Sequence, residues 1–240
     1  MFIRSILYCH VLFFIFFIFS TQPLHHTFSP IAAVVERELE DDNDGDNNGE
    51  NADEDFKSQN TIKICCTWGH NLLEGILTYY TDTESSTKQQ RDEVHNAVQE
   101  WDRNIDTLKF EESFNKKDGD ILIEFQEYEG NGRRALGQSI NKFDKSSFID
   151  KVQIIVYRGT AEYKFDEGII QRIVEHEMGH ALGLGHANFD GNLMAEKVND
   201  GTENVSECEV KAVLKANYWK LIADGSEPVM SEKNGIVCTE

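Results

Sequence analysis

The chain has 240 residues, of which 40% are hydrophobic and 28% are charged. This is enough apolar material for a core, so the composition excludes a wholly disordered protein. Asp and Glu together number 43 against 23 Lys and Arg, so the formal net charge is −20 at pH 7. Phosphate backbones repel so acidic a chain, and we therefore expect no nucleic-acid partner. The 3 prolines and 17 glycines are too few for collagen-like or proline-rich architecture.

Residues 1–22 are expected to direct export. Arg4 precedes an almost uninterrupted apolar run from Ile6 to Phe19, which is typical of a secretory signal peptide. The run is short for a membrane span, which needs about 20 apolar residues. No clear cleavage site follows, so an uncleaved N-terminal anchor remains the alternative, and it would be the protein's contact with a membrane. Either way we expect a secreted or cell-surface protein.

Residues 23–58 are expected to form an acidic, disordered linker or pro-segment. Aspartate, glutamate, asparagine and glycine dominate the run from Glu36 to Asp55, a composition that cannot bury a core. Calcium binding is the alternative, because five residues match positions 1, 3, 5, 6 and 12 of a calcium loop: Asp44, Asp46, Asn48, Gly49 and Asp55. Asn51 departs from that loop's usual apolar residue, and no amphipathic helix flanks it, so we favour the linker.

Regular periodicity begins at Thr61, where alternating apolar residues predict a strand up to Cys66. Ser86 and Gln89 have the spacing of a capping box and predict the start of the first helix. Its apolar face recurs at three- and four-residue intervals: Val94, Ala97, Val98, Trp101 and Ile105. Further strands are predicted around residues 108–110, 121–125, 138–140 and 152–157.

Two more helices are predicted towards the C-terminus. Asp166 can cap a helix that starts near Gly168. Ser206 and Glu209 form a second capping box, before apolar residues at helical spacing that continue to Trp219. Strands with one early helix and two late helices indicate one α+β domain over residues 59–222, followed by a tail over residues 223–240.

Three histidines of the second predicted helix and its end have the spacing of metal ligands. His176 and His180 are four residues apart, so they lie on one helix face, one turn from each other. Gly183 permits a left-handed residue that ends the helix, so that His186 can return as the third ligand. Three imidazoles without a fourth protein ligand leave zinc an open position, which is typical of a catalytic site.

Glu177 follows the first of these histidines directly, so it points near the metal without having to bind it. We therefore predict that Glu177 takes a proton from a zinc-bound water and passes it to a leaving amine. Met194 follows His186 by eight residues, and a methionine under such a site usually serves packing.

The run from His176 to His186, with Met194 beyond it, resembles the zinc motif and the methionine turn of metzincin proteases, and most closely of the matrixins. The resemblance covers Thr61 to about Leu221. It implies a zincin-like α+β catalytic domain, with a mixed twisted sheet, an active-site helix and a C-terminal helix. It also implies a zinc-dependent endopeptidase whose peptide substrate lies antiparallel to an edge strand; we expect a monomer.

Several positions depart from the matrixin pattern. Ala187 stands where matrixins usually have serine, and no tyrosine follows Met194 in the manner of astacins. The segment before Thr61 contains no cysteine after the apolar leader, so a cysteine latch cannot operate from it. Outside the motif the folded region contains His70 and His95 only, which does not support a second three-histidine zinc site, and we expect one zinc ion.

Four cysteines remain beyond the leader: Cys65, Cys66, Cys208 and Cys238. In an exported chain an even number indicates two disulfides, or one disulfide and free thiols. We predict a bridge between Cys208 and Cys238, with Cys65 or Cys66 as alternative partners. Cys65 and Cys66 themselves are not expected to pair, because neighbours on a strand point to opposite faces.

Two other functions remain open at this stage. One is a catalytically inactive zinc-binding or adhesive extracellular module, against which the intact Glu177 argues. The other is a calcium-dependent interaction protein that uses the acidic segment.

Overall fold

The computed structural model describes residues 59–128, 135–159, 164–196 and 204–239. The expected signal or anchor (residues 1–22) and the acidic segment with its candidate calcium loop (residues 23–58) lie outside these ranges. Within them, no helix has both the length and the apolar character needed to cross a membrane.

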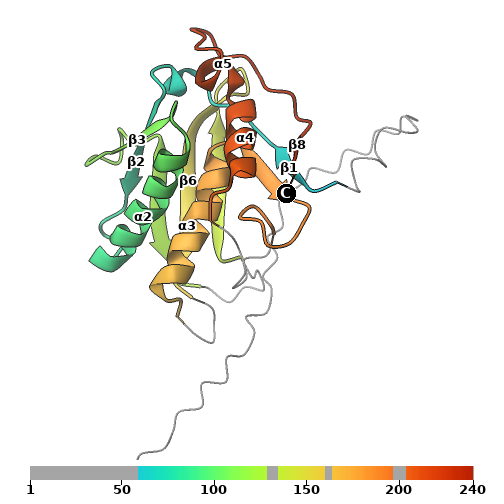
Figure 1. Cartoon of the computed structure of the whole chain (residues 1–240). Coiled ribbons are helices and arrows are strands. Elements are labelled where there is room, and N and C mark those ends of the chain that lie inside the picture. Colours follow the sequence, from blue (N-terminus) through green and yellow to red (C-terminus); the bar gives the residue numbers. More distant parts are fainter. Residues whose placement is uncertain (1–58, 129–134, 160–163, 197–203, 240) are drawn as a thin grey trace, which may run out of the picture. The chain divides into compact units, whose positions relative to one another are not determined.

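The main sheet has five strands in the order β3-β2-β4-β6-β5 (Figure 1). These strands are β2 (Ile76–Thr81), β3 (Lys109–Glu112), β4 (Ile121–Gln126), β5 (Gly137–Phe143) and β6 (Ile149–Tyr157). The first four in that order run parallel, whereas β5 pairs antiparallel with β6 at the edge. The mixed sheet predicted by the sequence is confirmed, but β2 was missed, because tyrosines and threonines fill most of its positions.

Two long helices, α2 (Lys88–Asn104) and α3 (Glu167–Ala181), lie side by side on the sheet (Figure 1). The indole N–H of Trp101 in α2 donates to the backbone carbonyl of Glu175 in α3 at 3.0 Å, and Trp101 is completely buried. Asp166 caps α3 as predicted. The capping box of α2 is one residue later than predicted, at Thr87 and Gln90, because the Ser86 hydroxyl donates instead to the carbonyl of Asp82.

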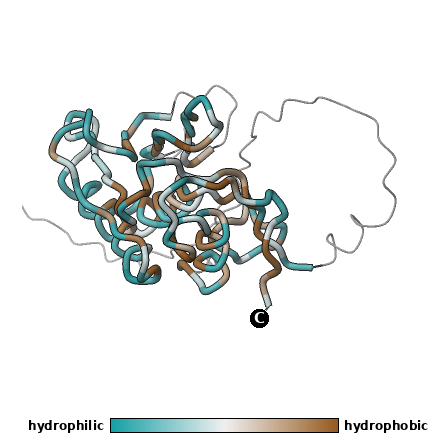
Figure 2. Tube along the Cα trace, turned by 90° about the horizontal axis from the view of Figure 1, so that it is seen from above, coloured by the Kyte–Doolittle hydropathy of each residue, from teal (hydrophilic) through white to brown (hydrophobic). Residues whose placement is uncertain are grey.

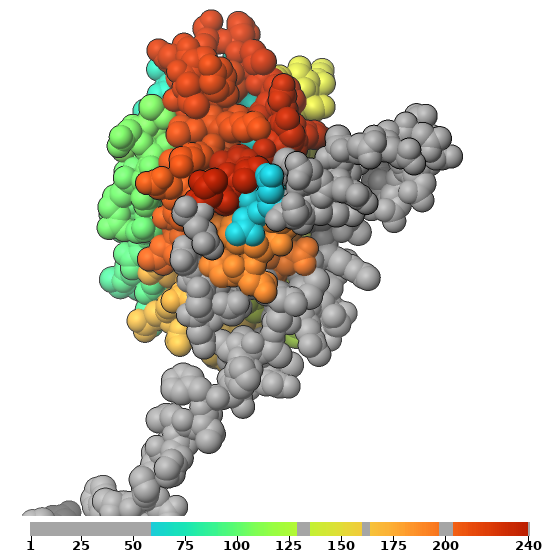
Figure 3. Space-filling view, turned by 45° about the vertical axis from the view of Figure 1, so that its right-hand side comes forward, coloured from blue at the N-terminus to red at the C-terminus, as the bar shows by residue number. Residues whose placement is uncertain are grey.

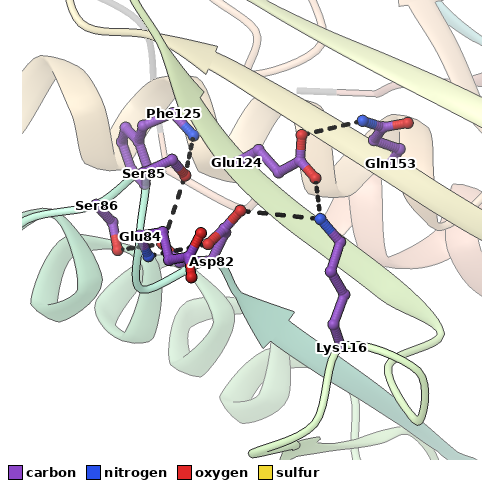
Figure 4. Close-up of polar contacts among 8 residues, drawn as sticks. All are labelled: Asp82, Glu84, Ser85, Ser86, Lys116, Glu124, Phe125 and Gln153. Carbon is purple, nitrogen blue, oxygen red and sulfur yellow. Dashed lines mark hydrogen bonds and ion pairs between the residues drawn. The ribbon is translucent and has the colours of Figure 1, made fainter.

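A polar cluster fixes the loop between β2 and α2 to the neighbouring strand (Figure 4). Lys116 makes ion pairs with Asp82 at 3.8 Å and with Glu124 of β4 at 2.6 Å. The hydrogen bond with Glu124 is the main reason why the pKa of Lys116 is raised. Ser85 accepts from the backbone N–H of Phe125 at 3.1 Å. These contacts hold the start of α2 at the C-terminal ends of the parallel strands.

A second sheet joins three distant segments in the order β7-β1-β8. Strand β1 (Thr61–Ile64) pairs antiparallel with β7 (Leu184–Ala187) on one side and with β8 (Ile236–Val237) on the other. In Figure 3 the first described residues lie directly beside the C-terminal segment and the segment that contains β7. The residues expected to form a tail therefore contribute a strand.

The last helical region is divided in two. The Ser206–Glu209 capping box is present at the start of α4 (Glu207–Ala216), and α5 (Tyr218–Leu221) follows. Asn217 separates them, because its buried side chain accepts from Trp68 N–H at 3.0 Å and donates to the carbonyl of Leu182 at 2.9 Å. The short helix η1 (His70–Leu72) precedes β2. Hydrophobic segments gather in the interior of the fold (Figure 2).

The described part of the chain contains two disulfides. The predicted bridge between Cys208 and Cys238 is confirmed, and it ties β8 to α4. The expectation that Cys65 and Cys66 do not pair is wrong, since they form the second disulfide. Strand β1 ends at Ile64, so these two residues are not held in strand geometry, and both of their backbone N–H groups donate to the carbonyl of Gly183.

Candidate metal centre

Helix α3 supplies two of the three predicted ligands. Its apolar residues face the interior, so its C-terminal half is enclosed in the molecule, and the residues from Ile173 to Ala181 are all buried. His176 and His180 are only 4% and 7% exposed. Their ring centroids are 4.7 Å apart, as the four-residue spacing predicts.

The third histidine arrives through a sharp change of chain direction at Gly183. This residue has φ +97°, a left-handed conformation that glycine adopts without strain, as the sequence predicts. A side chain there would also collide with the carbonyl oxygen of Cys66. The chain then enters β7, whose pairing with β1 brings His186 to ring-centroid distances of 5.6 Å from His176 and 4.8 Å from His180.

Backbone carbonyls orient the two helix histidines. His176 Nδ1 lies 2.6 Å from the carbonyl of Leu193, and His180 Nδ1 lies 2.9 Å from the carbonyl of Leu184. A carbonyl oxygen can only accept, so both Nδ1 atoms are the donors and both Nε2 atoms of the neutral rings carry lone pairs. These carbonyls were not found from the sequence, since a backbone acceptor has no side-chain signature.

The two Nε2 atoms, of His176 and His180, face each other at 3.1 Å. Two lone pairs at this distance repel unless a proton or a cation lies between them. Nitrogens that share one tetrahedral zinc at 2.0–2.1 Å are about 3.3 Å apart, close to the observed separation. One ligand atom from each of His176, His180 and His186 lies within 4.8 Å of the others. The donor set and its spacing therefore fit a metal ion, and in the described part of the chain no other such group occurs.

Glu177 is only 1% exposed and lies one residue beyond the first histidine on α3. It contacts the first residue of the edge strand, since a Cβ atom built on Gly137 would lie 2.6 Å from Glu177 Oε1. The preceding carboxyl, Glu175, is not part of the cluster: it accepts from Gln171 at 2.7 Å, and burial raises its pKa.

Met194 packs against α3 at Gly179, the residue before His180. It is fully buried, and its sulfur occupies the space where a side chain on Gly179 would be. The backbone N–H of Ala187 donates to the Met194 carbonyl at 2.7 Å. Ala187, which stands where matrixins usually have serine, therefore still connects β7 to the turn around Met194 through its backbone.

Comparison with known proteins identifies the family. Residues 67–215, more than half of the chain, match the sequence model of the matrixins. The chain belongs to the matrixin family. The matched residues include all three histidines, so the predicted resemblance and the α+β metzincin fold are confirmed. Matrixins are zinc metalloproteases, and this matrixin has a histidine cluster that can hold a metal ion.

Among solved structures, this matrixin is similar to high choriolytic enzyme 1, a hatching-enzyme zinc protease from the medaka fish Oryzias latipes. The identity is 17%, the TM-score is 0.32, and the match covers 50% of each chain. The matrixin thus aligns with about half the length of that protein. No curated protein matches it.

Proposed function

We propose that this matrixin is a secreted zinc-dependent endopeptidase in which His176, His180 and His186 bind the metal and Glu177 is the catalytic base. The observation that carries the proposal is the convergence of three imidazoles, two of them oriented by backbone carbonyls, beside the buried Glu177 carboxylate of α3. When bound, zinc supplies Lewis acidity, which polarises the substrate carbonyl and acidifies water.

Glu177 performs the proton transfers in this proposal. Its carboxylate accepts a proton from the attacking water and delivers it to the nitrogen of the leaving amine. Because Glu177 is buried, few solvent molecules compete for that proton. The Leu193 and Leu184 carbonyls hold two imidazoles in the tautomer that binds metal.

Strand β5 is the proposed binding surface for the peptide. It is the outer strand of the main sheet, and its other edge can pair with an extended chain by strand addition. Gly137 at its start contacts Glu177, so a peptide laid along β5 passes close to the proposed base. This arrangement supports an endopeptidase, because an extended peptide can continue in both directions past the scissile bond.

The remaining parts of the proposal concern domain organisation and location. Residues 1–22 would serve as the signal peptide or anchor, residues 23–58 as a linker or pro-segment, and residues 59–222 as the catalytic domain. Export is supported by the two disulfides, which persist in oxidising compartments.

The test of catalysis is the replacement of Glu177 by alanine, with zinc content and peptide hydrolysis measured on the same sample. We expect zinc to remain bound while hydrolysis falls by at least about 10² to 10⁴-fold. The exposed Glu207 of α4 is the matched control, and Glu207→Ala should keep parental activity. Near-parental turnover by Glu177→Ala would show that the assigned mechanism is wrong.

The test of the metal site is zinc analysis of protein purified without chelator. We expect about one equivalent in the parent and in Glu177→Ala, as for a lone catalytic site. His186→Ala should lose most of the metal, because it removes one of three ligands. Two equivalents that survive dialysis would contradict a single site. A parent that binds zinc but cleaves no peptide in a broad library would favour an inert zinc-binding module.

A further inference from the structure

Gly137 makes a close contact with Glu177. It is the first residue of β5, it is buried, and it pairs with Val156 of β6. A Cβ atom at this position would lie 2.6 Å from Glu177 Oε1, 2.9 Å from Glu177 Cγ and 2.8 Å from Ile173 Cγ2. No side chain can occupy that space unless its neighbours move.

The backbone at Gly137 does not itself require glycine. Positive φ angles occur at other glycines of the described chain, namely Gly75, Gly183 and Gly191. Glycine in a strand provides no side chain for packing and loses more conformational entropy on folding than other residues. The close approach of strand β5 to helix α3 is therefore what accounts for glycine here.

We propose that Gly137 is a positioning residue for Glu177, so that the bare backbone of β5 sets where the carboxylate lies. The inference rests on the proposed function, in which Glu177 is the base and β5 binds the peptide. Absence of a Cβ lets the carboxylate approach the edge strand directly. The proton acceptor is thereby held at the strand along which the scissile peptide is laid.

A methyl group at residue 137 would press on both Glu177 and Ile173, and the Glu177 carboxylate would move furthest. Seven residues of β5 are paired with β6, and Ile173 is β-branched and stiff in its helix. The Glu177 side chain has more rotatable bonds, so its carboxylate yields most easily. It must move by roughly 1 Å to regain an ordinary contact, and a misplacement of that size can cost about 10²-fold in rate.

The first test is kinetic and uses the full chain with Gly137→Ala. We expect bound zinc to be retained, kcat to fall by about 10 to 10²-fold, KM to change little, and the acid limb of the pH–rate profile to shift. Gly168→Ala is the matched control, because a Cβ there lies 3.8 Å from its nearest neighbour, Asp166 Oδ1. Parental kcat and an unchanged pH profile in Gly137→Ala would overturn the proposal.

The second test does not depend on activity. Gly137→Ala is made in the parent and in Glu177→Ala, and melting temperatures are measured for all four chains. Contact with Glu177 predicts a fall of roughly 3–10 °C in the parent and a smaller fall in Glu177→Ala, where the close approach to Ile173 Cγ2 at 2.8 Å remains.

An equal fall in both backgrounds, or failure to fold in both, would overturn the proposed contact. Folding only in the Glu177→Ala background would support it. If the parent proves to have no peptidase activity, the proposed function fails, and this thermal cycle still decides whether Gly137 positions Glu177.

Discussion

The bridge between Cys208 and Cys238 is expected to contribute strongly to stability. The two cysteines are 30 residues apart, and they connect the start of α4 to the residue after β8. Closing a loop of about that length lowers the entropy of the unfolded chain by an amount equivalent to ~3.6 kcal/mol at 25 °C. Measured values often fall below this limit, so replacing both cysteines by serine should lower the free energy of unfolding by about 2–4 kcal/mol.

Urea denaturation of the oxidised chain, followed by tryptophan fluorescence, measures this effect. With a typical slope of about 2 kcal/mol per molar urea, the midpoint should fall by about 1–2 M. The double replacement is compared with the parent because it leaves no free thiol from this pair. Zinc content at 25 °C should stay near the parental value, since the metal cluster lies on α3 and β7 rather than on α4 or β8.

A loss below about 1 kcal/mol would refute the reasoning, because it would mean that the unfolded chain gains little freedom when the loop is opened. A loss of zinc from protein that stays folded would refute the assumption that the histidines keep their positions without this bridge. It would show that β8 is needed to keep His186 in place through β1, and not only to stabilise the fold as a whole.

Two further predictions concern a glycine and a tyrosine. Gly183→Ala should reduce the free energy of unfolding by about 1–3 kcal/mol more than Gly191→Ala. Both glycines have positive φ, but only a side chain at 183 would collide with Cys66. Equal losses in thermal melts would contradict this prediction. Burial, and to a smaller extent the charge of Glu112, raises the pKa of Tyr79 to about 12. The folded state therefore keeps a proton that the unfolded state releases above pH 10, so stability falls as pH rises, by about 1.4 kcal/mol at pH 11. Tyr79→Phe should lack this component in unfolding curves at pH 9 and 11, and identical pH dependence in both chains would show the assignment to be wrong.

The histidine cluster was predictable because most of its information is local. The four-residue spacing of His176 and His180 fixes their common face, and Gly183 marks where the chain must turn. The caps at Asp166 and Ser206 were predictable for the same reason. Each depends on residues that are close in sequence.

Features that depend on long-range contacts were missed. Strand β2 has a buried threonine and a buried tyrosine on its inward side, which conceals the alternation that marks a half-buried strand. The break at Asn217 arises from bonds to Trp68 and Leu182, far away in sequence. The contact between Gly137 and Glu177 also joins residues whose neighbourhood only the folded sheet defines.

The three-stranded sheet makes the position of His186 depend on a segment that is far away in the sequence. His176 and His180 can approach each other as soon as one helix forms, whereas His186 is positioned by a strand that pairs with Thr61–Ile64, more than a hundred residues earlier. The arrangement of all three histidines seen here therefore forms only when β7 pairs with β1 in the folded chain. A metal held by all three histidines must favour the folded chain, so its binding and the pairing of β1 with β7 stabilise each other.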